Sequence, residues 1–200
     1  CLSSGNLYAP GAGSTPGGGG PADAGPVDEA SPTYPSGRAP YYLASKLCGE
    51  IWASHLDQTD QIAVAVLRPS AIYGPGMSSG VVRVFVERLS AGLPVVLSDA
   101  GRYHSDLVFV GDVVQATIAA LRQGARGVFN VGSGHSTSVA ELAAALVAIL
   151  GCDPQLVRSE PAGLHPSPGL AALDIQRALA AGLYAPTPLS VGLSRTLGIT

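Results

Sequence analysis

The chain has 200 residues, of which 46% are hydrophobic and 12% are charged, and its formal net charge is -3. This composition excludes a disordered acidic or basic protein, and the lack of a lysine- or arginine-rich run predicts no nucleic-acid or anionic-membrane partner. The longest apolar stretch, residues 139–150, is too short to cross a bilayer, and the opening residues lack the basic segment of a secretory leader. Three scattered cysteines without a CxxC pair predict free thiols and no metal site. We therefore expect a cytoplasmic protein, and the start at Cys1 predicts that more of the protein precedes it.

Helical and extended patterns alternate along the chain. The glycine- and proline-rich segment 11–37 predicts a surface loop without helix or strand. Residues 68–76, which include two prolines and two glycines, predict a second loop. The predicted helices cover 41–52, 81–91, 113–121, 138–150, 174–182 and 189–197, and the predicted strands cover 62–67, 95–97, 106–110 and 128–131. Asp112, Asp174 and Ser138 are the predicted N-caps, and Glu141 completes a capping box with Ser138. We interpret Asp106 as a buried polar group that packs in the core, not as one half of an acid/base pair. The alternation predicts an α/β fold with parallel strands.

Tyr42 and Lys46 are four residues apart on the first predicted helix, so their side chains lie on one face. A phenol is a poor base at neutral pH, but an ammonium group within about 6 Å favours the phenolate form. Such a tyrosine can take a proton from a hydroxyl group while hydride leaves the same carbon atom. The YxxxK spacing alone is common, and the alternative is a surface tyrosine and lysine on an amphipathic helix. The neighbouring segments decide between these interpretations.

Several segments, in order along the chain, resemble those of one enzyme family. They are Ser3-Ser4-Gly5-Asn6-Leu7-Tyr8, the Tyr42–Lys46 helix, Arg68-Pro69-Ser70-Ala71-Ile72-Tyr73-Gly74-Pro75-Gly76, residues 105–113 and residues 127–134. The last three are similar to the RPxxxYGPG, RDFVHVDDV and GVYNVGSG segments of the extended short-chain dehydrogenases. On these residues the chain is identified as a member of the NAD-dependent epimerase/dehydratase family, similar to UDP-glucose 4-epimerases but without their N-terminal part.

The resemblance implies roles for particular residues. Ser4, Tyr42 and Lys46 would form the catalytic triad, in which Ser4 binds the reacting oxygen and Lys46 also binds the nicotinamide ribose. The implied cofactor is NAD, with NADP left open, and the implied cofactor-binding residues are Tyr42, Lys46, Pro69 and Ser70. The implied substrate-binding residues are Ser4, Tyr42, Ala71, Tyr73, Arg83 and Arg102. No metal is implied.

The resemblance also implies the fold and its division. We expect an α/β protein that holds the C-terminal part of an NAD(P)-binding Rossmann fold and the smaller substrate-binding α/β region. Residues 1–75 would belong to the Rossmann part, with the loop 11–37 inserted. Residues 76–200 would form mainly the substrate-binding region, with a Rossmann strand returning near 106–131.

The sequence departs from the family pattern in ways that affect binding. Ala71 stands where the family often has Asn, and Ser105 stands where the family has an Arg that binds the sugar-nucleotide diphosphate. Arg102 and Arg83 are the candidates to replace that arginine. No GxxGxxG turn precedes Ser4, although such a turn binds the cofactor pyrophosphate in the family. The segment 132–137 resembles GxGxxG after a strand, but a threonine replaces the third glycine, so we expect a structural turn there.

We expect an NAD(P)-dependent oxidoreductase that acts on a sugar nucleotide and oxidises a hydroxyl group transiently. Epimerase chemistry is favoured over dehydratase chemistry, because Gly5 and Asn6 stand where a dehydratase of this family has an Asp-Glu pair. The alternatives are an NAD(P)-dependent ketone reductase of the same superfamily and a non-catalytic fragment without a cofactor cradle. A homodimer through the Tyr42 helix is left open by analogy with the family.

Overall fold

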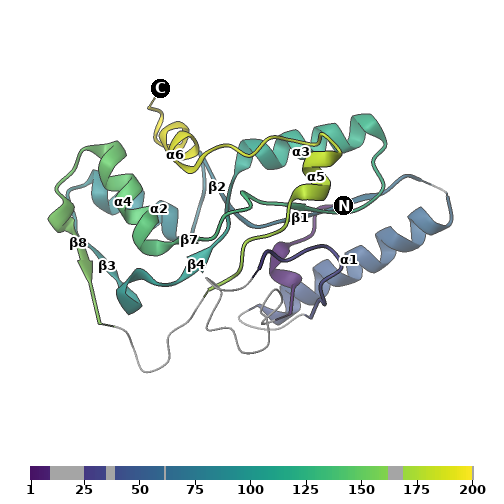
Figure 1. The fold of residues 1–200 in the computed structure, drawn as a ribbon, viewed down its shortest axis with the longest axis horizontal. Coiled ribbons are helices and arrows are strands. Elements are labelled where there is room, and N and C mark those ends of the chain that lie inside the picture. The colour runs from purple at the N-terminus through teal and green to yellow at the C-terminus, as the bar shows by residue number, and fades with distance from the viewer. Residues whose placement is uncertain (10–24, 35–38, 61, 162–168, 200) are drawn as a thin grey trace.

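The computed structural model describes residues 1–9, 25–34, 39–60, 62–161 and 169–199, and it has an α/β fold (Figure 1). Its helices are α1 (Pro40–Gln58), α2 (Val81–Ser90), α3 (Val110–Gln123), α4 (Val139–Leu150), α5 (Gln176–Ala180) and α6 (Leu189–Leu197). Its strands are β1 (Ala65–Pro69), β2 (Ala71–Tyr73), β3 (Val95–Leu97), β4 (His104–Ser105), β5 (Leu107–Phe109), β6 (Gly127–Val131), β7 (Thr137–Ser138) and β8 (Val157–Ser159). Short 3-10 turns are η1 (Gly5–Leu7), η2 (Ser98–Gly101) and η3 (Pro154–Leu156).

Strand β1 is buried along most of its length and lies between two parallel neighbours. On one side it pairs with β6, where Arg68 lies opposite Asn130. On the other side Leu2 bridges Leu67 in parallel, and the N–H of Ser3 donates to the Leu67 carbonyl at 2.7 Å. Helix α1 covers one face of this arrangement, and α3 and α5 cover the other (Figure 1). The carboxyl ends of these segments therefore meet at one edge, where parallel sheets bind their ligands.

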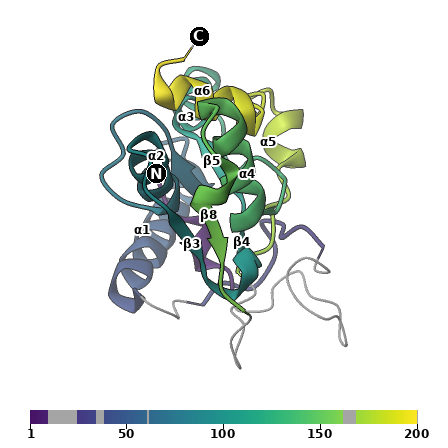
Figure 2. The ribbon, with the colours of Figure 1, turned by 90° about the vertical axis from the view of Figure 1, so that its left-hand side faces the viewer.

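Shorter strands and three helices form the second region of the fold. β2 pairs in parallel with β5, β3 pairs in parallel with β8, and β4 and β7 form an antiparallel pair. Helices α2 and α4 pack on each other, and α6 packs on α4 and β5. Figure 2 looks onto this region and shows β3 and β8 side by side, next to α4.

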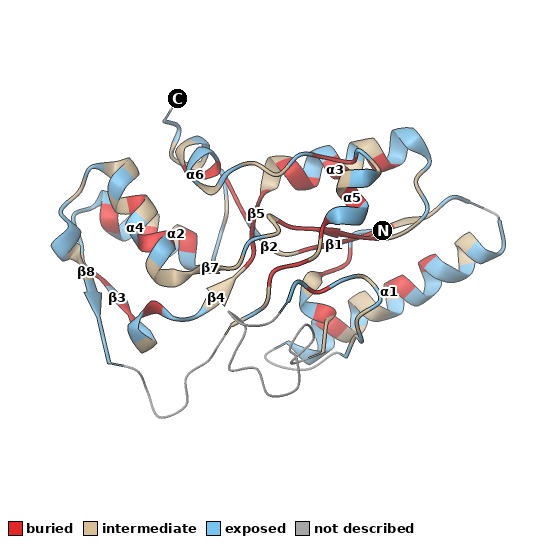
Figure 3. Cartoon of the chain, in the orientation of Figure 1, coloured by how far each residue is buried: buried red, intermediate tan, exposed pale blue. Residues whose placement is uncertain are grey.

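Two large clusters of buried apolar side chains stabilise the two regions. Figure 3 marks the buried residues of both regions in red. One cluster lies among β1, β6, α3 and α5 and includes Leu67, Phe129 and Leu183. The other lies among β3, β5, α2, α4 and α6 and includes Leu146 and Leu193. Removing this apolar surface from water is the main favourable contribution to folding. Within the described ranges, no helix combines the length and the apolar character that a membrane crossing requires.

Two predictions about loops are wrong. Residues 71–73, interpreted as part of a loop fixed by prolines, form β2 because β5 offers them a parallel partner. The segment 25–34 is not a structureless surface loop, because Val27 is buried and bridges Leu173 in parallel. Residues 11–24 and 35–37 of this predicted loop lie outside the described residues.

The predicted helix caps have mixed outcomes. The capping box of Ser138 and Glu141 at the start of α4 is confirmed. Asp112 is not an N-cap, because α3 already begins at Val110; its buried carboxylate accepts instead from the backbone and hydroxyl of Thr187, at 2.8 and 2.6 Å. Asp174 lies one residue before the N-cap of α5, although its carboxylate still accepts from a backbone N–H in the first turn, at 2.9 Å. Tertiary partners thus decide how each aspartate is used.

Candidate active site

Lys46 is the only lysine of the chain, and it lies on the α1 face that points toward the N-terminal segment. Its ammonium group donates to the Leu2 carbonyl at 3.1 Å and lies 5.4 Å from the centre of the Tyr42 ring. The Tyr42 side chain is 50% exposed, so a ligand can reach it. The structure therefore brings Tyr42 and Lys46 together beside the segment that leads to Ser4.

Ser4 is buried and caps the short turn η1, which packs on α1. Its Oγ accepts a hydrogen bond from the Asn6 N–H at 3.2 Å, and within the described part of the chain its hydroxyl donates to no protein group. A Cβ added to Gly5 would lie 3.0 Å from the Pro69 carbonyl oxygen, so this turn also packs on the end of β1. Among the described residues, no hydrogen bond joins Ser4 to the Tyr42 phenol. The site thus combines three segments that meet at one edge of the sheet.

Ser70 follows β1 and is held by a buried carboxylate. Its hydroxyl donates to Asp106 at 3.2 Å. The same carboxylate accepts from the N–H groups of Ser133, Gly134 and Leu173, at 2.6, 3.3 and 3.0 Å. Asp106 is 2% exposed and therefore acts as an internal anion that joins three loops. This arrangement agrees with the prediction that Asp106 is a packing-site polar group.

The glycine-containing turn 132–137 is not a phosphate cradle in this structure. The N–H groups that could bind a phosphate already donate to Asp106, and a Cβ on Gly132 would lie 2.4 Å from that carboxylate. A second anion at the same donors would meet a buried negative charge, which is strongly unfavourable. The turn is structural, as the missing third glycine predicts.

Tyr73 lies in the core of this structure, and its predicted role in substrate binding stays a prediction. Its side chain is 2% exposed, its hydroxyl donates weakly to the Leu189 carbonyl at 3.5 Å, and its ring meets Phe109 edge to face. Burial, and to a smaller extent the nearby Asp112 carboxylate, raises the pKa of the Tyr73 phenol. Packing of α6 on β2 turned this side chain into the core.

The remaining predicted substrate residues lie on the second region of the fold. Ala71 is partly exposed on β2. Arg83 pairs with Glu87 at 2.7 Å on α2, and Arg102 pairs with Asp99 at 3.2 Å after η2. Among the described residues, neither arginine contacts the Tyr42–Lys46 pair. Substrate binding by Arg83 and by Arg102 therefore stays a prediction.

Buried polar residues that no sequence motif predicts lie beneath the site. Glu50 and Arg68 form an ion pair there, and Ser3 donates to the same glutamate. One signal was available: Glu50 lies four residues after Lys46, on the same helix face. Within the described residues, no group of three His, Cys, Asp or Glu side chains could hold a metal ion.

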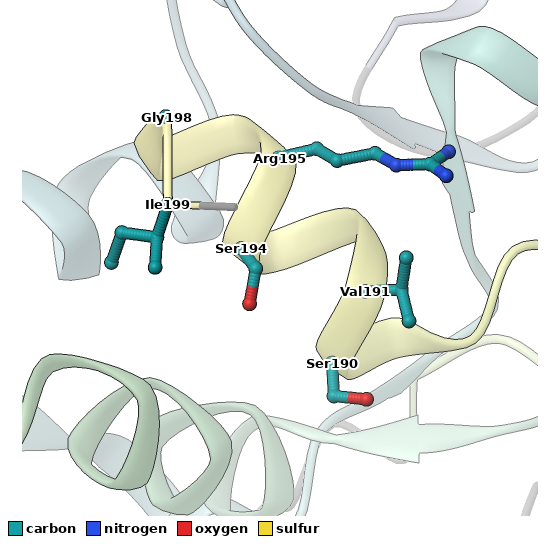
Figure 4. Close-up of a pocket in the computed structure, with 6 residues that line it drawn as sticks. All are labelled: Ser190, Val191, Ser194, Arg195, Gly198 and Ile199. Atoms are coloured by element: carbon teal, nitrogen blue, oxygen red, sulfur yellow. The ribbon is translucent and has the colours of Figure 1, made fainter.

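A hollow of about 540 Å³ lies along α6, and Figure 4 shows its lining residues. They are Ser190, Val191, Ser194, Arg195, Gly198 and Ile199. None of them is a predicted site residue, so the hollow is separate from the candidate active site.

The fold and the Tyr42–Lys46 pair define an α/β protein of the Rossmann type, with its polar residues gathered where parallel strands end. A profile described as "NAD dependent epimerase/dehydratase family" matches residues 2–132. The chain belongs to this family.

Individual relatives agree with this assignment. The chain is 34% identical over 131 residues to a UDP-glucose 4-epimerase of Mycolicibacterium smegmatis, covering 63% of this chain and 39% of that protein. It is 31% identical over 160 residues to a dTDP-4-dehydro-6-deoxy-D-allose reductase of a Streptomyces species, covering 78% of this chain and 48% of that protein. The crystal structure of a Thermus thermophilus UDP-glucose 4-epimerase in complex with NAD matches with a TM-score of 0.74 and 27% identity, over 100% of this chain and 63% of that one. The chain thus spans less than half the length of these curated relatives.

Proposed function

We propose that this chain supplies the catalytic residues of an NAD(P)-dependent oxidoreductase that acts on a sugar nucleotide, with epimerase chemistry favoured over dehydratase chemistry. The observation that carries the proposal is the position of the Lys46 ammonium. It lies 5.4 Å from the centre of the Tyr42 ring and donates to the carbonyl of Leu2, two residues before Ser4. The names of the relatives support sugar nucleotides as the substrate class.

In the proposed mechanism Tyr42 exchanges a proton with a substrate hydroxyl group. The Lys46 ammonium stabilises the phenolate that this exchange requires. Ser4 donates to the same substrate oxygen, because its Oγ accepts from Asn6 and keeps its own proton available. A bound nicotinamide supplies the acceptor, and later the donor, of the hydride at the carbon atom that carries this oxygen. Ser4 and Tyr42 would therefore be connected through the substrate.

The described residues fit one end of the dinucleotide. An ammonium group has three donors, and Lys46 uses one of them on Leu2, which leaves donors for the hydroxyls of the nicotinamide ribose. Pro69 and Ser70 lie at the end of β1, beside the turn that holds Ser4. The pyrophosphate end has no cradle among the described residues, since Asp106 occupies the donors of the 132–134 turn. Binding of the whole dinucleotide requires residues other than these.

The preference for epimerase chemistry rests on the turn after Ser4. Gly5 and Asn6 carry no carboxylate, and elimination of water needs an acid and a base beyond Tyr42. We place the diphosphate of the substrate near Arg102 or Arg83, which both hold exposed guanidinium groups. These assignments follow from residue chemistry and from the family.

A ketone reductase of the same superfamily is the second candidate. It is favoured by Ser105, which stands where the family has a diphosphate-binding Arg and here pairs with Thr137 between β4 and β7. The similarity over 78% of this chain to a dTDP-4-dehydro-6-deoxy-D-allose reductase supports reductase chemistry, although the substrate in that name is a sugar nucleotide and not a small ketone. The same triad would serve this reaction, since only the direction of hydride transfer and the substrate differ.

The test is catalysis by protein expressed from the complete coding sequence. We expect Tyr42→Phe to lower kcat by a factor of about 10² to 10⁴, because the proton-transfer group is lost, while leaving KM nearly unchanged. Lys46→Met should lower kcat and also weaken NAD binding. Activity that survives both changes would rule out the triad.

A substrate panel separates the two candidate reactions. UDP-sugars, dTDP-4-dehydro sugars and small ketones are each supplied with NAD or NADPH, and the products are identified by NMR. We expect epimerised UDP-sugars. Turnover of small ketones alone would reject the sugar-nucleotide assignment and support the reductase.

A further inference from the structure

A buried ion pair joins the helix of the candidate site to the central strand. Glu50 of α1 and Arg68 of β1 are joined by two hydrogen bonds, Nε to Oε1 at 2.9 Å and Nη2 to Oε2 at 2.7 Å. Their side chains are only 8% and 7% exposed. The hydroxyl of Ser3 donates to the same carboxylate. One carboxylate therefore connects three segments that are distant in the sequence.

Each of these contacts lies close in the sequence to a residue of the proposed site. Glu50 lies four residues after Lys46 and eight after Tyr42, so all three project from one side of α1. Ser3 immediately precedes Ser4, and Arg68 immediately precedes Pro69. The ion pair and the Ser3 hydrogen bond are therefore placed to set the rotation of α1 about its own axis, relative to the Ser3–Ser4 segment and to the end of β1.

Arg68 is also held on the side away from Glu50. Its Nη1 donates to the Tyr8 hydroxyl at 3.1 Å, and its guanidinium lies 5.0 Å from the centre of the Tyr8 ring. The Tyr8 hydroxyl donates in turn to Asn130 of β6 at 2.5 Å. Burial disfavours the charged guanidinium, but hydrogen bonds to Glu50 and Tyr8 outweigh it and raise the pKa of Arg68. Arg68 is therefore a fixed cation against which Glu50 is oriented.

We propose that the Glu50–Arg68 pair is the positioning element of the candidate active site, which holds Lys46 over Tyr42 and against Leu2. A buried ion pair adds little net stability compared with apolar residues of similar volume, because desolvation offsets the attraction. Its two parallel hydrogen bonds, however, fix distance and angle in a way that apolar contacts do not. The consequence for catalysis rests on the proposed function, whereas the effect on Lys46 does not.

The test uses Lys46 as its own reporter. Because the chain has one lysine, lysine labelled with ¹³C at its ε-methylene gives a single NMR signal. When Tyr42→Leu is the only substitution, it should shift this signal relative to its position in the wild-type protein, since the ammonium lies beside the ring that is removed. In Glu50→Gln, and in the double variant with Glu50→Met and Arg68→Leu, we expect Tyr42→Leu to cause a clearly smaller shift, because a Lys46 ammonium that is no longer held at the Leu2 carbonyl lies beside the ring for less of the time.

The double variant separates positioning from structural support. Apolar replacement of a buried pair is commonly neutral or stabilising, so this variant should unfold at the same denaturant concentration as the wild type or a higher one. Glu50→Gln keeps the side-chain volume and serves if the double variant does not fold. The control, Asp60→Asn, removes a carboxylate from the exposed pair with Arg126 and should keep the wild-type shift. A folded variant without the ion pair that retains the full Tyr42-dependent shift would overturn the proposal.

Activity then distinguishes this proposal from the proposed function. In protein expressed from the complete coding sequence, loss of positioning should lower kcat by about tenfold or more with little change in KM. If the Lys46 signal becomes clearly less dependent on Tyr42 but kcat is unchanged, the positioning role stands and the catalytic role of Tyr42 and Lys46 fails.

Discussion

Asp106 organises the edge of the sheet where the candidate site lies. It accepts hydrogen bonds from Ser70, which follows β1, from Ser133, which follows β6, and from Leu173 in the C-terminal segment. Buried carboxylates are costly unless they are fully hydrogen-bonded, and these donors satisfy that requirement. The consequence is functional as well as structural, because the donors of the glycine-containing turn are no longer available to a phosphate group.

Gly192 explains why Tyr73 lies in the core. A Cβ at position 192 would lie 2.0 Å from the Tyr73 hydroxyl oxygen, a distance that no pair of unbonded atoms tolerates. Only a glycine in α6 lets the phenol pack beneath the helix. This close approach has no signature in the local sequence.

We therefore predict that Gly192→Ala destabilises the protein by about 1–3 kcal/mol through overpacking, although alanine favours helices by about 1 kcal/mol relative to glycine. Denaturant unfolding measures the change. Adding Tyr73→Phe, which removes the clashing oxygen, should recover a large part of the loss. Equal stability of wild type and Gly192→Ala would show that α6 does not pack on Tyr73 this closely.

At the scale of elements, α4 has the most complete local start signal. The Ser138 hydroxyl accepts from the Glu141 N–H at 3.1 Å, and the Glu141 carboxylate accepts from the Ser138 N–H at 2.7 Å. Hydrogen bonds from Ser138 lower the pKa of Glu141 from its ordinary value of 4.5. The bond from the Ser138 backbone N–H has the largest effect, and the bond from the Ser138 hydroxyl has the second largest. A lowered pKa in the folded state means that the ionised carboxylate stabilises the fold.

The sign of the resulting pH dependence follows from linkage. The stabilisation by Glu141 is present above pH 4.5, and it is lost as the pH falls through the lower pKa of the folded protein. We predict that Glu141→Gln costs about 0.5 kcal/mol at about pH 7, a small value because the site is exposed to water. The free energies of unfolding of the two proteins should converge as the pH falls below 4.5 and through the lowered pKa, and a difference that grows toward acid would contradict this assignment.

At the scale of the whole molecule, most buried apolar side chains belong to two large clusters. Residues 1–75 and 76–200 stay our proposal for the Rossmann part and the substrate-binding part. The chain crosses between the clusters more than once, since β1 and β6 contribute to one and β5 contributes to both. A homodimer through α1 stays a prediction as well.

We predict that residues 1–200 by themselves bind NAD too weakly to measure. The ribose donors at Lys46 are present, but the donors that could bind a pyrophosphate are satisfied by Asp106. Calorimetric titration of NAD into the chain should show no binding heat, and saturation at about micromolar concentration would refute this expectation. Asp106→Asn is an informative companion, because it removes the competing charge from the turn.

Local sequence predicted a large part of the fold. Helical periodicity, short β-branched runs and the Ser138 capping signal gave α1 to α6 and the central strands, because these patterns depend on neighbouring residues only. The spacing of Tyr42 and Lys46 likewise placed both on one helix face. Strands β2, β4, β7 and β8 and the burial of Val27 were missed, because each forms only when a distant strand or loop offers hydrogen bonds.

The sequence by itself thus determined the helices, the central strands, the family and the phenol–ammonium pair, since helix geometry and motif order are properties of the linear chain. Only the tertiary structure decided which polar groups are already satisfied. It assigned the turn donors to Asp106, turned Tyr73 into the core and joined Glu50 to Arg68 across 18 positions of sequence. Hydrogen bonds between distant residues depend on how strands and helices pack, and that packing is a property of the whole fold.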